Sequence, residues 1–253
     1  MIAADPAGFL AALRDRAPLL SGEMGPCPPG WIAAGADNSA ALAALVGALS
    51  LHEPGAGPAY WATRAWSMLE WQPAALAVYA VHGFGLLPAL DSLSLRPQGA
   101  LVAGFRLGRE TLSQACEDTL VTLAGAALRA QMDVLLADLC AVARLKPANA
   151  RRLLADRILF SLLRVARHVP GLDGPARLAA LSEAWLEAAG LAGQSRLVPI
   201  TLSGGRVQMV VDRKTCCLAY RSAAGTVCDS CPTRQDDATR FARMKEYWEH
   251  PDV

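Results

Sequence analysis

Four cysteines near the C-terminal end constrain this chain more than any other feature of its sequence. Cys216 and Cys217 are adjacent, ten residues follow, and Cys228 and Cys231 then enclose two more. Four thiolates this close in sequence can hold a tetrahedral metal ion or a small iron–sulfur cluster. Structural zinc sites usually take paired ligands from knuckles with two to four residues between them, which adjacent cysteines do not easily form. The adjacent pair therefore favours a cluster with two iron atoms, while a structural zinc site and free or oxidised thiols stay open.

Composition and charge bear on the class of protein and on its compartment. The chain has 253 residues, of which 53% are hydrophobic and only 6% aromatic, and a core rich in alanine and leucine favours helices packed on helices. A net charge of +1 gives no argument for nucleic acid. The first twenty residues lack the pattern of a secretory signal, and seven cysteines without such a leader fit a reducing cytosol. We predict a cytoplasmic protein, with a peripheral position at the inner membrane left open.

Hydrophobic periodicity and turn residues predict a helix-rich α+β protein. The expected helices cover residues 6–20, 41–51, 60–71, 73–90, 110–145, 149–168, 175–190 and 236–250. Two β-hairpins are expected, at residues 92–107 and 196–212. The most membrane-like run, residues 73–90, contains His82 and two prolines and barely reaches the length of a span. We therefore predict a buried helix there and no transmembrane segment.

A domain boundary is expected where the helical part of the sequence gives way to the second hairpin. It would separate a mainly helical body, residues 1–193, from a C-terminal module, residues 194–253, that carries the cysteines. A module of about sixty residues is small for an independent hydrophobic core and commonly needs a metal to fold.

The sequence RKTCC is followed by ten residues and then by CDSC. This pattern resembles the C-terminal signature of the ferric siderophore reductases, the FhuF-like proteins. Members of that family carry Cys-Cys-x10-Cys-x2-Cys and use it to bind a [2Fe-2S] cluster. The resemblance implies that the ligands here are Cys216, Cys217, Cys228 and Cys231. It is specific over about residues 213–234, and the body resembles the family more loosely, through YWATRAW and FSLLRVARHVPG.

The resemblance also implies a function, the one-electron reduction of siderophore-bound Fe(III) in the cytoplasm, typically as a hydroxamate complex. The hard oxygen ligands of a siderophore hold Fe(II) far more weakly than Fe(III), so that reduction releases the iron. The sequence has no G-x-G-x-x-G after a strand and no phosphate loop. An external donor, such as a ferredoxin or a flavin- or NAD(P)H-dependent reductase, is therefore expected. A non-catalytic iron–sulfur carrier or sensor and a zinc-stapled binding module stay open as alternatives.

Further residues are candidates for tuning the cluster or holding the substrate. Positive charge near a cluster raises its potential and can dock an acidic donor, and the basic residues around the cysteines are Arg213, Lys214, Arg221 and Arg234. Thr215 and Ser230 are candidates for hydrogen bonds to sulfur, and Gly225 is expected to let the loop turn. A pocket for a bulky polar chelate would use aromatic faces and arginines, and the candidates are Trp61, Arg64, Trp66, Arg106 and Arg109. Singly, each of these five is also an ordinary core or surface residue.

Overall fold

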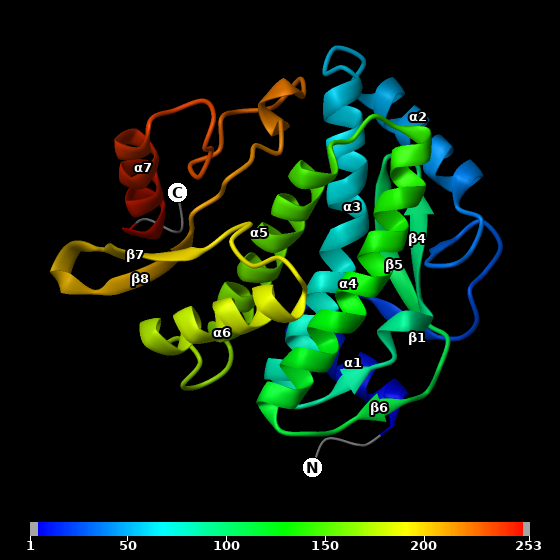
Figure 1. Cartoon of the computed structure of the whole chain (residues 1–253), viewed down its shortest axis with the longest axis horizontal. Coiled ribbons are helices and arrows are strands. Elements are labelled where there is room, and N and C mark those ends of the chain that lie inside the picture. The colour runs from blue at the N-terminus through cyan, green and yellow to red at the C-terminus, as the bar shows by residue number, and fades with distance from the viewer. Residues whose placement is uncertain (1–4, 250–253) are drawn as a thin grey trace.

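The computed structural model describes residues 5–249, which form the expected helix-rich α+β fold (Figure 1). The α-helices are α1 (Pro6–Arg16), α2 (Ser39–His52), α3 (Pro58–Tyr79), α4 (Glu117–Val142), α5 (Pro147–Ala166), α6 (Pro175–Ala188) and α7 (Asp237–Glu249). The strands are β1 (Gly22–Met24), β2 (Ile32–Ala33), β3 (Leu87–Pro88), β4 (Leu93–Gln98), β5 (Leu101–Leu107), β6 (Leu112–Ser113), β7 (Leu197–Thr201) and β8 (Val207–Val211). The end of the predicted helix 236–250 lies outside the described residues.

Helix α3 runs through the middle of the body and packs against α2, α4, α5 and β5 (Figure 1). The sequence predicted two helices here, residues 60–71 and 73–90, but α3 continues through Pro73. A proline removes only one N–H bond, and burial on several sides holds the helix together. Gln72 joins it to β5, since its amide donates to the Val102 carbonyl (3.2 Å) and accepts from the Gly104 N–H (2.9 Å).

The prediction of a helix over residues 73–90 is wrong for the second half of that range, which is not α-helical. After Tyr79 the chain passes through a π-helical turn, Ala80–Phe84, and Gly85 then adopts a φ of +64°. Glycine tolerates this left-handed conformation at little cost, and the turn ends the helix there. Leu87 and Pro88 form the short strand β3, which pairs with β6.

A four-stranded sheet covers one side of the body, in the order β1-β5-β4-β2. Strands β4 and β5 form the predicted hairpin, with Leu95 opposite Phe105, and β1 joins β5 in parallel. Leu93, Leu95 and Phe105 are buried beneath the helices. The sheet thus closes the core on the side away from the cysteine loop (Figure 1).

Helix α4 differs from the predicted helix 110–145, since residues before Glu117 are extended and the helix itself is unbroken. Among the described helices, α4 alone is long and apolar enough to cross a membrane, and half of its most apolar stretch is buried inside the fold. The buried residues form one stripe that includes Leu120, Leu128, Leu135 and Leu139. A buried core helix can be as long and as apolar as a membrane-spanning one, so the length and composition of α4 do not by themselves indicate a span.

The C-terminal part is attached to the body through α5 and α6. Strands β7 and β8 form the second predicted hairpin, and Leu197, Met209 and Val211 at its base join the main core. Ile200 and Met244 belong to a separate small cluster between the hairpin and α7. The cysteine loop lies between β8 and α7, beside α5 (Figure 1). The boundary between residues 193 and 194 remains a prediction.

Candidate functional site

The four array cysteines lie together in the loop between β8 and α7. The sulfurs of Cys216 and Cys231 are 3.7 Å apart. The Cys217 thiol interacts with the thiols of Cys216 and Cys228, so that the four form one continuous row. Leu218 follows the adjacent pair in a left-handed conformation (φ +60°), and its N–H lies 3.3 Å from the Cys216 sulfur. Cys231 is buried and the other three are half-buried.

The neighbours of Cys217 in this row stabilise its deprotonated, thiolate form. Hydrogen bonds from Cys216 and Cys228, with a contribution from the charge of Arg213, lower the pKa of Cys217. The pKa values of Cys216 and Cys228 are raised, because each donates to the Cys217 sulfur and because both are partly buried. Metal loading must therefore release protons from this row, as thiolate ligands require.

Arg213 connects the cysteine loop to the helical body. Its guanidinium nitrogen Nη1 lies 3.8 Å from the Cys217 sulfur and 3.7 Å from the Cys228 sulfur. Its Nε donates to Asp156 on α5 (3.0 Å), and the Ser195 hydroxyl donates to the other oxygen of that carboxylate (2.6 Å). Arg213 and Asp156 are both buried. A guanidinium is always charged, so a fixed positive charge faces two of the sulfurs.

The other predicted basic residues lie further from the sulfurs. Lys214 donates to the Gly193 carbonyl (2.6 Å), Arg234 lies over the Tyr220 ring, and Arg221 is exposed. Thr215 is buried and Ser230 lines a cavity, and the described contacts include no hydrogen bond from either to a sulfur. Backbone N–H groups do lie beside the sulfurs: that of Leu218 beside Cys216, that of Ala219 beside Cys217, and those of Thr233 and Arg234 beside Cys231. A tuning or docking role for these residues remains a prediction.

Sequence reasoning missed two residues that hold the loop, Asp156 and Arg243. Arg243 on α7 donates to the Val227 carbonyl (3.0 Å) and pairs with Asp229 (2.8 Å), on either side of Cys228. A signal for Asp156 was present, since it interrupts an otherwise apolar face of α5 between Leu154 and Ile158. An acidic residue at a buried helical position usually has a buried partner.

Gly225 permits the tight turn between the two halves of the array. A Cβ at this position would lie 2.1 Å from the Ala219 carbonyl oxygen and 2.6 Å from the Ser222 hydroxyl oxygen. Its N–H donates to the Ser222 carbonyl (2.9 Å), which closes the turn. The structure thus gives a steric reason for the glycine that the sequence singled out.

We expect Gly225→Ala to lower the iron content of the purified protein several-fold, because the loop must open to admit the methyl group. Iron and sulfide assays on anaerobically purified protein measure this. Gly55→Ala, in the turn between α2 and α3, is the control, because its added Cβ meets no atom within 4 Å and its φ is not positive. Equal iron contents in the two variants would contradict the steric argument.

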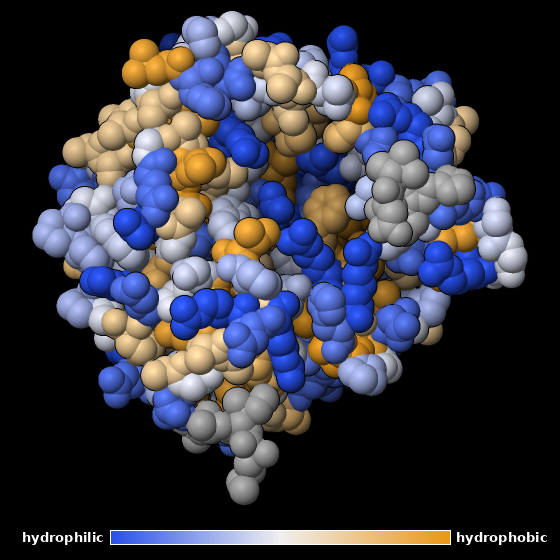
Figure 2. All heavy atoms as spheres, turned by 180° about the vertical axis from the view of Figure 1, so that it is seen from behind, coloured by the Kyte–Doolittle hydropathy of each residue, from blue (hydrophilic) through white to orange (hydrophobic). Residues whose placement is uncertain are grey.

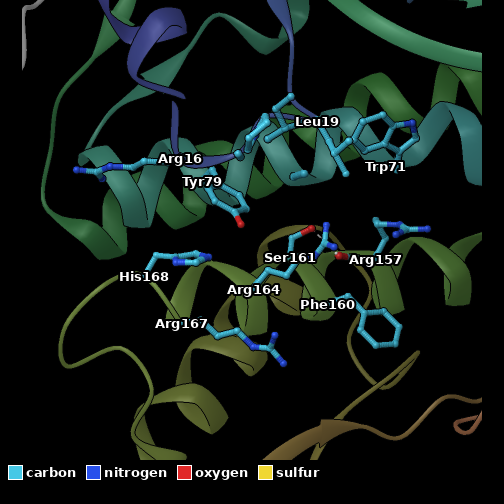
Figure 3. A pocket seen from close by; sticks show the side chains of 14 residues that line it. Arg16, Leu19, Trp71, Tyr79, Arg157, Phe160, Ser161, Arg164, Arg167 and His168 are labelled. Atoms are coloured by element: carbon cyan, nitrogen blue, oxygen red, sulfur yellow. Dashed lines mark hydrogen bonds between the residues drawn. The ribbon is translucent and has the colours of Figure 1, made fainter. Parts of the chain in front are cut away.

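Two cavities include residues of the cysteine loop, and a third, larger cavity adjoins α5. A cavity of about 150 Å³ is lined by Arg64, Glu70, Arg213 and Cys217, among others. A second, of about 300 Å³, includes Cys228 and Ser230 in its lining. The third, of about 610 Å³, lies between α3, α5 and the segment after α1, as Figure 3 shows. Figure 2 shows the face opposite to that of Figure 1, where a hollow has hydrophilic side chains at its rim and apolar ones deeper in.

The predicted substrate residues lie in different parts of the fold. Only Arg64 lines a cavity together with an array cysteine. Trp66 is 1% exposed, within the core, and Trp61 is half-buried; their indole nitrogens donate to the carbonyls of Ala150 and Glu53. Arg106 pairs with Glu23, and Arg109 pairs with Asp91. A substrate role for the five remains a prediction, and the structure brings only Arg64 near the cysteines.

Glu70 is a buried acid next to the smallest cavity. Its Oε1 lies 3.9 Å from Arg157 Nε, and its Oε2 has no hydrogen-bond partner in the described residues. Burial raises the pKa of this carboxyl from 4.5 to about 8, even though the charge of Arg157 acts to lower it. Glu70 is therefore mainly neutral at pH 7 and leaves the charge of Arg157 largely uncompensated.

The raised pKa of Glu70 predicts a pH-dependent stability. The unfolded chain releases this proton near pH 4.5 and the folded protein near pH 8, so the stability falls as the pH rises between these values. Glu70→Gln removes this loss and should stabilise the protein at pH 7.5 by roughly 2–4 kcal/mol, with little difference near pH 4.5. Urea unfolding of both proteins at the two pH values measures this. A wild-type advantage at pH 7.5 would contradict it.

The site fits a cluster through its donor set and its surroundings. Four cysteines supply the required thiolates, a buried guanidinium offsets their charge, and a backbone N–H points at one sulfur. As they stand, the described residues contain no group of three or more His, Cys, Asp or Glu side chains arranged to hold a single metal ion. A set of four cysteines in these surroundings is typical of an iron–sulfur protein.

The particular type of cluster domain follows from comparison with known families. A family model described as the FhuF 2Fe-2S C-terminal domain matches residues 213–232, from Arg213 to just beyond Cys231. No solved structure matches the chain. The matched segment is similar to the [2Fe-2S]-binding C-terminal domains of the FhuF type, which confirms the predicted resemblance and the predicted cofactor. The match does not extend into the helical body.

Proposed function

We propose that this protein is an oxidoreductase that reduces siderophore-bound Fe(III) to Fe(II) by one electron. The FhuF-type cluster domain points to the siderophore-iron reductases. The observation that carries the proposal furthest is the position of Cys228, which lines the 300 Å³ cavity. That cavity shares Phe160, Arg164 and Arg167 with the 610 Å³ cavity. Space of the size that ligand sites usually have therefore begins beside a cluster ligand.

The residues of this chain have two tasks in such a reaction, beside the electron transfer that the cluster performs. When bound, the [2Fe-2S] cluster supplies the single electron that converts Fe(III) to Fe(II). Arg213 stabilises the added negative charge, because its guanidinium lies close to two sulfurs. The side chains of the large cavity hold the chelate next to the 300 Å³ cavity that Cys228 lines, and Fe(II), bound weakly by hard oxygen ligands, then leaves for other ligands.

An external protein is proposed to return the electron to the cluster. Arg221 and Arg234 are exposed around the cysteine loop and could bind an acidic donor, such as a ferredoxin or a flavin- or NAD(P)H-dependent reductase. A cytoplasmic site of action and a hydroxamate substrate are the further expectations that the family resemblance supplies.

The test is electron transfer from the reduced protein to a ferric siderophore. Anaerobically purified protein is reduced, freed of reductant and mixed with a ferric hydroxamate or a ferric catecholate complex while Fe(II) is trapped with ferrozine. We expect the visible spectrum of the oxidised cluster to return as one Fe(II) forms per cluster. A cluster that stays reduced with every complex would support a carrier or sensor instead. Colourless protein with one zinc per chain would overturn both.

A further inference from the structure

We propose that the large cavity between α3 and α5 is the chelate-binding site and that it selects iron complexes with a net negative charge, of the tris-catecholate class. This inference rests on the proposed function, and it departs from the hydroxamate substrate that the family resemblance implies. It follows from the charge and the aromatic lining of the cavity.

The lining of the 610 Å³ cavity carries positive charge and no carboxylate. Its basic side chains are Arg16, Arg157, Arg164, Arg167 and His168. A ferric tris-hydroxamate formed from three singly charged groups is neutral, whereas a ferric tris-catecholate carries three negative charges. A basic cavity attracts the second complex and is indifferent to the charge of the first.

The guanidinium charges in this cavity are largely uncompensated. The acidic neighbours of Arg157 are Glu70, which is mainly neutral at pH 7, and Asp156, whose charge is already paired with Arg213. Arg164 has no hydrogen bond or ion pair from its guanidinium in the described residues. Arg16 and Arg167 lie over the rings of Phe84 and Trp248, which fixes them without neutralising them.

Aromatic side chains occupy both walls of the cavity. Trp71 and Tyr79 come from α3, and Phe160 comes from α5 on the opposite wall (Figure 3). The indole nitrogen of Trp71 already donates to the Val102 carbonyl (3.1 Å), which leaves its ring for stacking. Catecholate rings can stack on such faces and on guanidinium planes, whereas hydroxamate groups carry no ring.

Tyr79 adds a hydrogen-bond donor to this lining. Its hydroxyl points into the cavity in Figure 3, toward the α5 wall. Burial raises its pKa, with the charges of Arg164 and Arg167 acting in the opposite direction. The hydroxyl is therefore protonated at neutral pH and can donate to an anionic oxygen.

The position of the arginines also suits electron transfer between two negatively charged groups. A [2Fe-2S] cluster with four thiolate ligands is itself anionic, so it repels an anionic chelate. Arg164 and Arg167 line both the large cavity and the one that contains Cys228. Their charges therefore lie between the two partners and offset the repulsion.

Binding can be tested without any electron transfer by replacing Fe(III) with Ga(III), which prefers the same oxygen ligands and accepts no electron from the cluster. Two hexadentate gallium complexes are titrated into the oxidised, cluster-loaded protein by calorimetry, one a tris-catecholate and one a neutral tris-hydroxamate. We expect the tris-catecholate to bind at least about tenfold more tightly, with an affinity that falls as salt is added.

Variants of Arg164 test whether the preference for the tris-catecholate complex arises in the large cavity. Arg164→Gln should weaken tris-catecholate binding about tenfold, because a charge-assisted hydrogen bond is lost, while Arg164→Lys should retain most of the affinity. Arg206→Gln is the matched control, because Arg206 is exposed at the β7–β8 turn and lines none of the cavities described above. Equal affinity for the two complexes, or equal effects of Arg164→Gln and Arg206→Gln, would overturn the inference. Either result leaves the reductase proposal intact, since that is decided by Fe(II) formation.

Discussion

A Cys228→Ser protein is expected to lose its iron and sulfide, from about two of each per chain to nearly none. Serine offers a harder and less easily ionised oxygen, and the remaining three thiolates cannot complete both iron sites. Cys228 lies at one end of the row of four thiols, beside Cys217 and Arg213. Iron and sulfide assays, together with the visible spectrum of anaerobically purified protein, measure the loss.

Cys27→Ser is the matched control for that experiment. Cys27 is exposed in the N-terminal part of the chain, and its thiol contacts only nearby carbonyl oxygens among the described residues. This variant should retain the full cluster. Full iron and sulfide in Cys228→Ser would remove Cys228 from the ligand set.

The second large effect is expected from Arg213→Gln, which should make the reduction potential of the cluster more negative. The variant removes the positive charge that faces the sulfurs of Cys217 and Cys228. It also leaves Asp156 buried without its ion-pair partner, which should cost about 3–5 kcal/mol of stability. A redox titration followed by electron paramagnetic resonance measures the potential, and urea unfolding measures the stability.

Two further variants separate the electrostatic effect from a general loss of structure. Arg213→Gln combined with Asp156→Asn removes the unpaired carboxylate, so it should recover much of the stability while the potential stays low. Arg206→Gln should leave the potential unchanged, because Arg206 is exposed at the β7–β8 turn and makes no described contact with a sulfur. A wild-type potential in Arg213→Gln would show that this guanidinium does not tune the cluster.

The cysteine loop and both hairpins could be predicted from the sequence because their signals are local. The spacing of the cysteines by itself favours a cluster over a zinc site, and the residues of each hairpin lie close together in the chain. Helix α3 was harder to predict, because Pro73 suggests a break that burial against α5 and β5 prevents. The end of that helix depends on Gly85, one glycine among several.

The cavity and the support of the loop could not be predicted because their residues are distant in sequence. Asp156 lies 57 positions before Arg213, and only the folded chain brings them together. Arg157, Phe160, Arg164 and Arg167 follow one another at helical spacing, which the sequence does show. That spacing predicts a shared face but not that Trp71 and Tyr79 lie opposite to it.

Helix α5 carries both the anchor of the cofactor loop and one wall of the large cavity, on neighbouring faces. Asp156 faces Arg213, while the next residue, Arg157, begins the row that lines the cavity. The two roles therefore belong to different side chains of one rigid element. With the chelate in the cavity as proposed, substitutions along the cavity row would change which chelate is accepted while Asp156 continues to hold the cofactor loop, so the iron source and the redox centre could change independently.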